Sequence, residues 1–166
     1  MIEILKQKEE DFVNLIRENE GIIFKITRIY GTDPEDARDL YQEVVFQLWK
    51  SFEKFRGESK ISTWMYRVSL NTALTHSKKR KRTESGSLQT ELLHLYEETD
   101  RILDERSEML YRQIQSLNVV DKGIILLYLE GKSYEEISSI TGFSASNVGT
   151  KLGRIRDKLR KKIMVS

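Results

Sequence analysis

Residues 133–162 are S-Y-E-E-I-S-S-I-T-G-F-S-A-S-N-V-G-T-K-L-G-R-I-R-D-K-L-R-K-K, and this stretch has the pattern of two helices joined by a sharp turn. Ser133 is a preferred N-cap, and Glu136 three residues later completes a capping box for a short first helix. Gly142 suits the left-handed conformation that ends such a helix, and Ser144 can cap a second, longer one. The apolar residues of the second helix recur every three or four positions, which predicts one buried face made of Val148, Leu152, Ile155, Leu159 and Ile163.

The remaining faces of this second helix are polar and basic, and they carry Asn147, Thr150, Lys151, Arg154, Lys158 and Lys161. A short helix, a glycine turn and a longer basic helix together form the pattern of a helix-turn-helix, whose second helix enters the DNA major groove. The same pattern also fits two amphipathic helices of an ordinary bundle with a solvated basic face. The rest of the chain has to decide between these two interpretations.

The composition favours an all-α protein that folds without disulfides. Only one proline is present among 166 residues, long stretches show helical periodicity, and none shows sustained strand alternation. The chain contains no cysteine, which excludes disulfides and thiolate metal sites and fits a reducing cytoplasm. The N-terminus lacks the apolar core of a signal peptide, and no run approaches the ~20 apolar residues of a membrane span, so we expect no direct membrane insertion.

Charge is distributed unevenly along the chain, although the net charge is only +2. Residues 78–82 are K-K-R-K-R and residues 151–162 are also basic, whereas residues 91–108 carry a net negative charge. Two separated basic segments suggest two contact points on a polyanion. Between them, residues 83–103 have no helical stripe, so we expect two small helical domains, 1–82 and 104–166, joined by a flexible linker.

The N-terminal segment predicts helices up to about Tyr30, with a break or kink at Gly21, and then a helix over residues 34–52 that Asp33 caps. On a helical wheel, Phe46 falls opposite the apolar face of the 34–52 helix, beside Asp39, Gln42 and Glu43, and Trp49 lies on the shoulder. Either another helix covers Phe46, or this face binds a partner through an apolar anchor with a polar rim.

The next predicted helix covers residues 60–79, with Ser59 as its candidate cap. Arg67, Asn71 and Lys78 share one flank of it near Thr63, and amide and guanidinium groups suit the reading of base edges. Phe55 and Trp64 lie near basic residues and could stack with unpaired bases, but core packing is the alternative role for such aromatics. Beyond the linker we expect a helix over residues 104–117 and another over 119–130, which Asn118 caps.

Two segments resemble a known family. D-P-E-D-A-R-D-L-Y-Q-E-V-V-F-Q-L-W (33–49) and F-R-G-E-S-K-I-S-T-W-M-Y-R-V-S-L-N (55–71) resemble the N-terminal domain of bacterial RNA polymerase sigma factors of the extracytoplasmic-function (ECF) group. Residues 128–160 resemble the second domain of the same family. Both segments occur in the family's order, and the resemblance extends over nearly the whole chain. It implies a transcription initiation factor that directs promoter-specific initiation and is not an enzyme.

The resemblance also implies roles for individual residues. It assigns binding of the polymerase β′ coiled coil to Asp39, Gln42, Glu43, Phe46 and Trp49. It assigns recognition and opening of the promoter −10 element to Phe55, Arg56, Ser59, Lys60, Thr63, Arg67, Asn71, Lys78, Lys79 and Arg80. It assigns reading of the −35 element to Ser144, Ala145, Asn147, Thr150, Lys151 and Arg154. The implied partners are core RNA polymerase through β′ and β, promoter DNA and an anti-sigma factor.

Two glycines depart from the family pattern, because Gly149 and Gly153 stand where the family often has a basic residue and a histidine or similar residue. Either the backbone approaches DNA closely at Gly149, or −35 recognition is weaker and differently specified. The alternatives to a sigma factor are a helix-turn-helix regulator that acts without polymerase exchange and a sigma-like decoy for an anti-sigma factor. An enzyme is not expected, since His76 and His94 are isolated and no catalytic residue set, metal site, cofactor motif or small-molecule substrate site is recognisable.

Overall fold

The computed structural model describes residues 1–80 and 105–165, with side chains described except at residues 79–80, 105–107 and 163–165. In this part of the chain every regular element is an α-helix. The N-terminal half comprises α1 (Ile2–Glu18), α2 (Glu20–Tyr30), α3 (Pro34–Phe52) and α4 (Ile61–Arg80). The C-terminal half comprises α6 (Glu105–Gln115), α7 (Val119–Leu129), α8 (Tyr134–Thr141) and α9 (Ala145–Val165). The prediction of an all-α fold is therefore confirmed, whereas the predicted linker lies outside the described residues.

Helices α3 and α7 begin at the side-chain caps that the sequence predicts. Asp33 accepts a hydrogen bond from the backbone N–H of Asp36, and Pro34 occupies the first turn of α3. Asn118 caps α7 by accepting from the N–H of Asp121 at 2.9 Å. These caps satisfy donors that the first helical turn leaves without an intrahelical partner, so they fix where each helix begins.

The helix-turn-helix of the C-terminal half forms as predicted. Ser133 accepts from the N–H of Glu136, and Ser144 accepts from the N–H of Asn147, each at 3.1 Å. Gly142 ends α8 with φ at 86°, in the left-handed region. The buried face of α9 contains Val148, Leu152, Ile155 and Leu159, while Ile163 lies outside the described side chains.

Two local predictions were wrong. The break between α1 and α2 lies at Asn19, whose side chain donates to the carbonyl of Leu15, and Gly21 lies inside α2. Helix α4 begins at Ile61, and the N–H of Trp64 donates to the carbonyl of Lys60, so Lys60 takes the capping position predicted for Ser59. Both errors arose because local hydrogen bonds set the helix ends, whereas the predictions rested on residue type alone.

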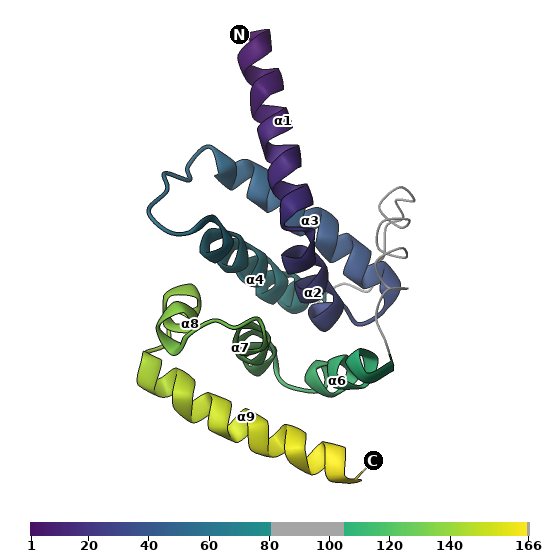
Figure 1. The fold of residues 1–166 in the computed structure, drawn as a ribbon. Coiled ribbons are helices and arrows are strands. Elements are labelled where there is room, and N and C mark those ends of the chain that lie inside the picture. The colour runs from purple at the N-terminus through teal and green to yellow at the C-terminus, as the bar shows by residue number, and fades with distance from the viewer. Residues whose placement is uncertain (81–104, 166) are drawn as a thin grey trace.

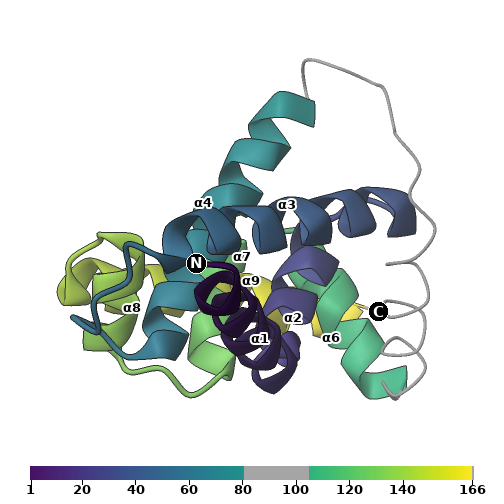
Figure 2. The same ribbon diagram turned by 90° about the horizontal axis from the view of Figure 1, so that it is seen from above.

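In the N-terminal half, α2, α3 and α4 pack on one another, and α1 projects beyond them (Figure 1). The start of α1 makes few contacts, since Met1, Ile2, Ile4 and Leu5 are all exposed. Its second half is held against α3 through Phe12, whose ring lies edge-on to Trp49 and Phe52 at centroid distances of 5.0 and 5.5 Å. Viewed from above, α1 is seen nearly along its axis (Figure 2).

Helix α7 is buried on almost every side. Residues 123–127 are buried at five successive positions, which covers the full circumference of a helix. Its own half packs against it through α8 and α9, and on the other side α2 and α4 lie against it. The buried side chains of both halves form a continuous hydrophobic core. Within the described residues, no helix combines the length and apolar character that crossing a bilayer requires.

Two glycines of the helix-turn-helix should respond to alanine in opposite directions. Gly153→Ala should raise the free energy of unfolding by about 0.5–1 kcal/mol, because Gly153 is helical and nothing lies within 4 Å of an added Cβ. Gly142→Ala should lower it by about 1–2 kcal/mol, because its φ of 86° strains an L-residue. Urea denaturation of both variants checks this, and stabilisation by Gly142→Ala would contradict the cap assignment.

Candidate nucleic-acid and polymerase interfaces

The outer face of α3 carries an exposed aromatic side chain. Phe46 is 53% exposed, and no other described helix covers it. The ammonium nitrogen of Lys50 lies 5.4 Å from the centre of its ring. Of the two alternatives left by the sequence, a covering helix is therefore excluded within the described residues, and Phe46 remains available to a partner.

Phe46 lies where two surface grooves meet. The first groove, of about 630 Å³, runs between α3 and α4. Its lining is mainly polar and consists of Asp39, Gln42, Glu43, Phe46, Gln47, Asn71, Thr72, Thr75 and His76. The structure thus places four of the predicted polymerase-binding residues beside Asn71, which was predicted to contact the −10 element.

The second groove lies between α1 and α3 and is more apolar. Glu9, Phe12, Val13, Gln42, Val45, Phe46 and Trp49 line it. Trp49 is half-buried. Its ring packs edge-on against Phe12, and the ammonium of Lys8 lies 4.8 Å from the ring centre. All five predicted polymerase-binding residues therefore lie along one surface of α3, with an apolar centre and carboxylates at one end.

The carboxylates at the start of α3 are close enough to interact. Partial burial, together with the negative charges of Glu35 and Asp36, raises the pKa of Asp39 above its ordinary value. Asp36 is also held in place, since its Oδ1 lies 2.8 Å from Nε2 of His76 on α4. Within the described residues no group of three or more His, Cys, Asp or Glu side chains could hold a metal ion.

The loop before α4 combines basic and aromatic side chains. Arg56 and Lys60 are exposed, and Ser59 is half-buried. The ring of Phe55 lies 5.0 Å from that of Trp64, with an angle of 36° between the ring planes. Trp64 is only 8% exposed, so it belongs to the core, whereas Phe55 is half-buried.

Along α4 the predicted DNA-contacting residues are not equally accessible. Thr63 is 7% exposed and is therefore buried in this state, whereas Asn71 and Lys78 are exposed. The guanidinium of Arg67 donates to the backbone oxygen of Ser139 at 3.0 Å and lies 3.3 Å from its hydroxyl. Arg67 is thus engaged by α8 of the other half. Lys79 and Arg80 end α4, and their side chains lie outside the described ones.

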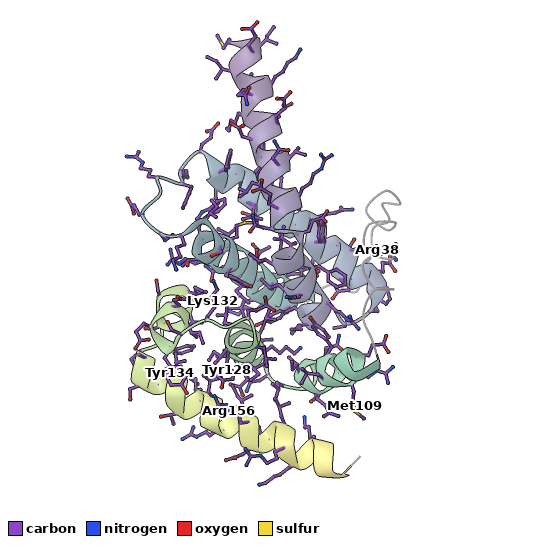
Figure 3. The ribbon with its side chains drawn as sticks, viewed as in Figure 1. Arg38, Met109, Tyr128, Lys132, Tyr134 and Arg156 are labelled. Carbon is purple, nitrogen blue, oxygen red and sulfur yellow. The ribbon has the colours of Figure 1, made fainter. Side chains whose placement is uncertain are left out.

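The predicted −35 reading face of α9 is open. Ser144, Asn147, Thr150 and Arg154 are exposed, and Ala145 and Lys151 are half-buried. The ammonium of Lys151 lies 5.0 Å from the centre of the Phe143 ring, which holds this side chain near the turn. The opposite face of α9 packs inward, where Arg156 lies 4.3 Å from the ring of Tyr128 on α7 (Figure 3).

The structure gives a local reason for Gly149. A Cβ added at this position would lie 3.3 Å from Cε2 of Tyr134, the first residue of α8. Tyr134 is 38% exposed and lies against the start of the recognition helix (Figure 3). An added Cβ would press on this ring, so packing inside the protein is an explanation for the glycine that stands beside a close approach of DNA.

Family models match both halves of the chain. A model described as Sigma-70 region 2 matches residues 15–83, and one described as Sigma-70, region 4 matches residues 107–159. The chain belongs to the sigma-70 family, in its ECF group. Proteins of this family are non-enzymatic regulators of transcription.

Curated relatives agree with the family models. The ECF RNA polymerase sigma-E factor of Haemophilus influenzae is 26% identical, over 98% of this chain and 93% of its own length. The sigma-E factor of Escherichia coli K12 is 28% identical over 77% of this chain and 74% of its own length. The RNA polymerase sigma-H factor of Pseudomonas aeruginosa is 27% identical over 78% of this chain and 74% of its own length.

Solved structures share the sigma fold. The sigma factor RpoE of Bartonella quintana, solved with the anti-sigma factor NepR, matches with a TM-score of 0.72, at 17% identity over 95% of this chain and 99% of that one. CnrH, solved with the cytosolic domain of CnrY, matches with a TM-score of 0.69, at 18% identity over 95% of this chain and 90% of that one.

The contacts between the two halves had no signal in the sequence. Lys25 and Glu130 form an ion pair of 2.7 Å although they are 105 positions apart. Glu130 lies in the segment that resembles the family's second domain, but no pattern in the sequence pairs it with Lys25. Tyr134 was also missed, because only the packed structure places it beside Gly149.

The contact between Tyr134 and Gly149 predicts a coupling between the two positions. Gly149→Ala should stabilise the protein less than Gly153→Ala does, because its new Cβ must displace the Tyr134 ring by a few tenths of an ångström. In a Tyr134→Ala background, Gly149→Ala should recover the full gain of about 0.5–1 kcal/mol. Denaturation of the parent, the two single variants and the double variant completes the cycle, and equal gains in both backgrounds would contradict the steric explanation.

Proposed function

We propose that this sigma factor binds core RNA polymerase through the outer face of α3 and directs it to promoters that its two domains, 1–82 and 104–166, read together. The exposure of Phe46 between two grooves carries the polymerase-binding part of the proposal. An exposed aromatic ring framed by Asp39, Glu43 and amides has the composition of an interface anchor with a polar rim. Trp49 extends its apolar centre, and the β′ coiled coil is the proposed occupant.

Promoter reading is assigned to two separate surfaces. Asn147, Thr150 and Arg154 present amide, hydroxyl and guanidinium groups on the open face of α9, which suits major-groove readout of a −35 element. Phe55 and the basic loop before α4 suit capture of an unpaired base at the −10 element. Each contact is weak alone, and tethering both in one chain raises the effective concentration of the second.

Regulation by a protein partner is part of the proposal. The two structural neighbours were solved with an anti-sigma factor and with a cytosolic domain of a second protein, which supports an anti-sigma partner for this chain. We assign the protein to the cytoplasm, where core polymerase and promoter DNA are found, and we assign it no enzymatic activity.

Phe46→Ala should reduce the affinity for purified bacterial core polymerase by roughly 30-fold, as expected for loss of an interface hot spot. The fold should not change, because the side chain is largely exposed in the free protein. Met109→Ala on α6 is the matched control, since Met109 is 51% exposed and lies outside the proposed interface. Fluorescence anisotropy with labelled protein gives both affinities, and equal binding by the two variants would reject the assignment of Phe46.

Arg154→Ala should weaken −35 recognition by about 1–3 kcal/mol, the contribution of one good side-chain contact to a base. Run-off transcription with purified core on genomic fragments identifies a promoter, and activity is then compared on its −35 variants. Arg160→Ala serves as the control, because this exposed arginine lies six residues further along α9. The assigned role fails if Arg154→Ala leaves the −35 preference unchanged.

A further inference from the structure

Helix α1 extends beyond the domain on which it packs, and its projecting part carries an apolar stripe (Figure 1). Ile2, Leu5 and Val13 are all exposed. At about 100° per residue, these three positions fall within about 80° of one another, so they share one side of the helix. Glu9 lies within the same arc, whereas Ile4 falls on the side opposite Val13. The exposed apolar residues of α1 are thus concentrated on one side, with a carboxylate among them.

The direction of α1 is set by contacts near its middle. Phe12 is buried, and its ring lies edge-on to Trp49 and Phe52 of α3. Lys8 is paired with Glu53 at the end of α3, and its ammonium also lies close to the Trp49 ring. The turns before Lys8 therefore extend from the domain as a continuous part of an anchored helix. A partner meets a surface that is already ordered, which lowers the entropic cost of binding.

The stripe leads into the apolar groove between α1 and α3, which has a volume of about 590 Å³. Val13 lines this groove from α1, and Phe46 lines it from α3. Val13 therefore joins the stripe on α1 to the side chain proposed as the anchor for core polymerase. The two helices cross at an angle and form a corner (Figures 1 and 2). A helix lying in that corner would contact both of them, in the manner of an amphipathic helix in a groove.

The charges around Phe46 indicate the chemistry of the partner. Asp39 and Glu43 line the polar groove on one side of Phe46, and Glu9 lines the apolar groove on the other. Among the described residues that line either groove, none is a lysine or an arginine. DNA, an anionic lipid surface or a second copy of this chain would bring negative charge against these carboxylates. A helix with basic residues beside an apolar stripe is complementary to them.

We propose that the side of α1 formed by Ile2, Leu5, Glu9 and Val13 is a second docking surface for core RNA polymerase, so that one polymerase helix lies in the corner between α1 and α3. The identity of the partner rests on the proposed function. The stripe packs on the apolar side of that helix, and Glu9 pairs with a cation at its edge. Helix α1 also excludes water from one side of Phe46, which strengthens the contact made by this anchor.

Leu5→Ala should weaken binding of the full chain to purified bacterial core polymerase about fivefold, and adding Val13→Ala should weaken it about 25-fold in total. Ile4→Ala is the matched control and should stay within about twofold of the parent. Ile4 is 73% exposed against 52% for Leu5, and it lies on the side opposite Val13. Alanine preserves the helix at each position. Fluorescence anisotropy gives the affinities, and equal binding by Leu5→Ala and Ile4→Ala would overturn the proposal.

Photocrosslinking measures the contact directly. Since the chain has no cysteine, Leu5→Cys and Ile4→Cys each provide one site for a benzophenone label. Irradiation with core polymerase should give an adduct with a polymerase subunit from Leu5→Cys in several-fold higher yield than from Ile4→Cys. Equal yields would overturn the proposal. An adduct between two copies of this chain would also overturn it, because the stripe would then serve self-association.

Charge reversal tests the role assigned to Glu9. Glu9→Lys and Glu10→Lys change the net charge equally, both residues are exposed, and their side chains lie about 100° apart around the helix. Glu9→Lys should weaken core binding about tenfold at low salt, and Glu10→Lys less than about threefold. The difference should shrink as salt is added, because salt screens exposed charges. Equal losses in the two variants would reject a specific contact at Glu9.

Phe46→Ala in the same assay separates this proposal from the proposed function. Weak binding by Phe46→Ala together with parental binding by Leu5→Ala would refute the surface on α1 and leave the assignment of α3 intact. Weak binding by Leu5→Ala together with parental binding by Phe46→Ala would support α1 and refute the anchor on α3. Failure of the parent to bind core polymerase would overturn both.

Discussion

Helix α7 imposes the main constraint on this structure, because an element that is apolar around its whole circumference must be covered on both sides. Its own half covers one side through α8 and α9. The other side is covered only when α2 and α4 lie against it, which places Gly123 under Tyr30. The buried side chains of both halves then form one continuous core, even though the two halves match separate regions of the sigma-70 family.

The helices and their ends were largely predictable because the interactions that create them are local. Asp33, Asn118, Ser133 and Ser144 each accept a hydrogen bond from a backbone N–H three residues later, so residue type and spacing carry the information. The sequence predicted the break at Gly21, but it lies at Asn19. The side-chain amide of Asn19 donates a hydrogen bond to the carbonyl of Leu15, and this bond marks the end of α1. Flexibility of a residue indicates where a chain can turn, and it does not fix where the turn occurs.

The candidate surfaces were predictable in part. The helical wheel separated Phe46 from the core of α3, and the structure leaves it exposed. The same method placed Thr63 and Arg67 on an open flank of α4, because a wheel shows only which residues share a side and not which neighbour covers it. For Arg67 the neighbour is α8, whose Ser139 lies 72 positions away in the chain. No pattern within α4 encodes a contact at that separation.

Arg67 takes part in two interactions, one with Ser139 of α8 and one proposed with DNA. Its guanidinium donates to the backbone oxygen of Ser139 in this structure, and the proposed recognition of the −10 element uses it on DNA. A substitution at this position therefore alters promoter preference and the contact between α4 and α8 together. Selection cannot tune these two traits independently through Arg67, so a variant with a new target sequence also has an altered contact between the two halves of the molecule. Lys25 and Glu130 lie outside the proposed DNA-reading surfaces, and changes there can compensate for the second effect without disturbing the first.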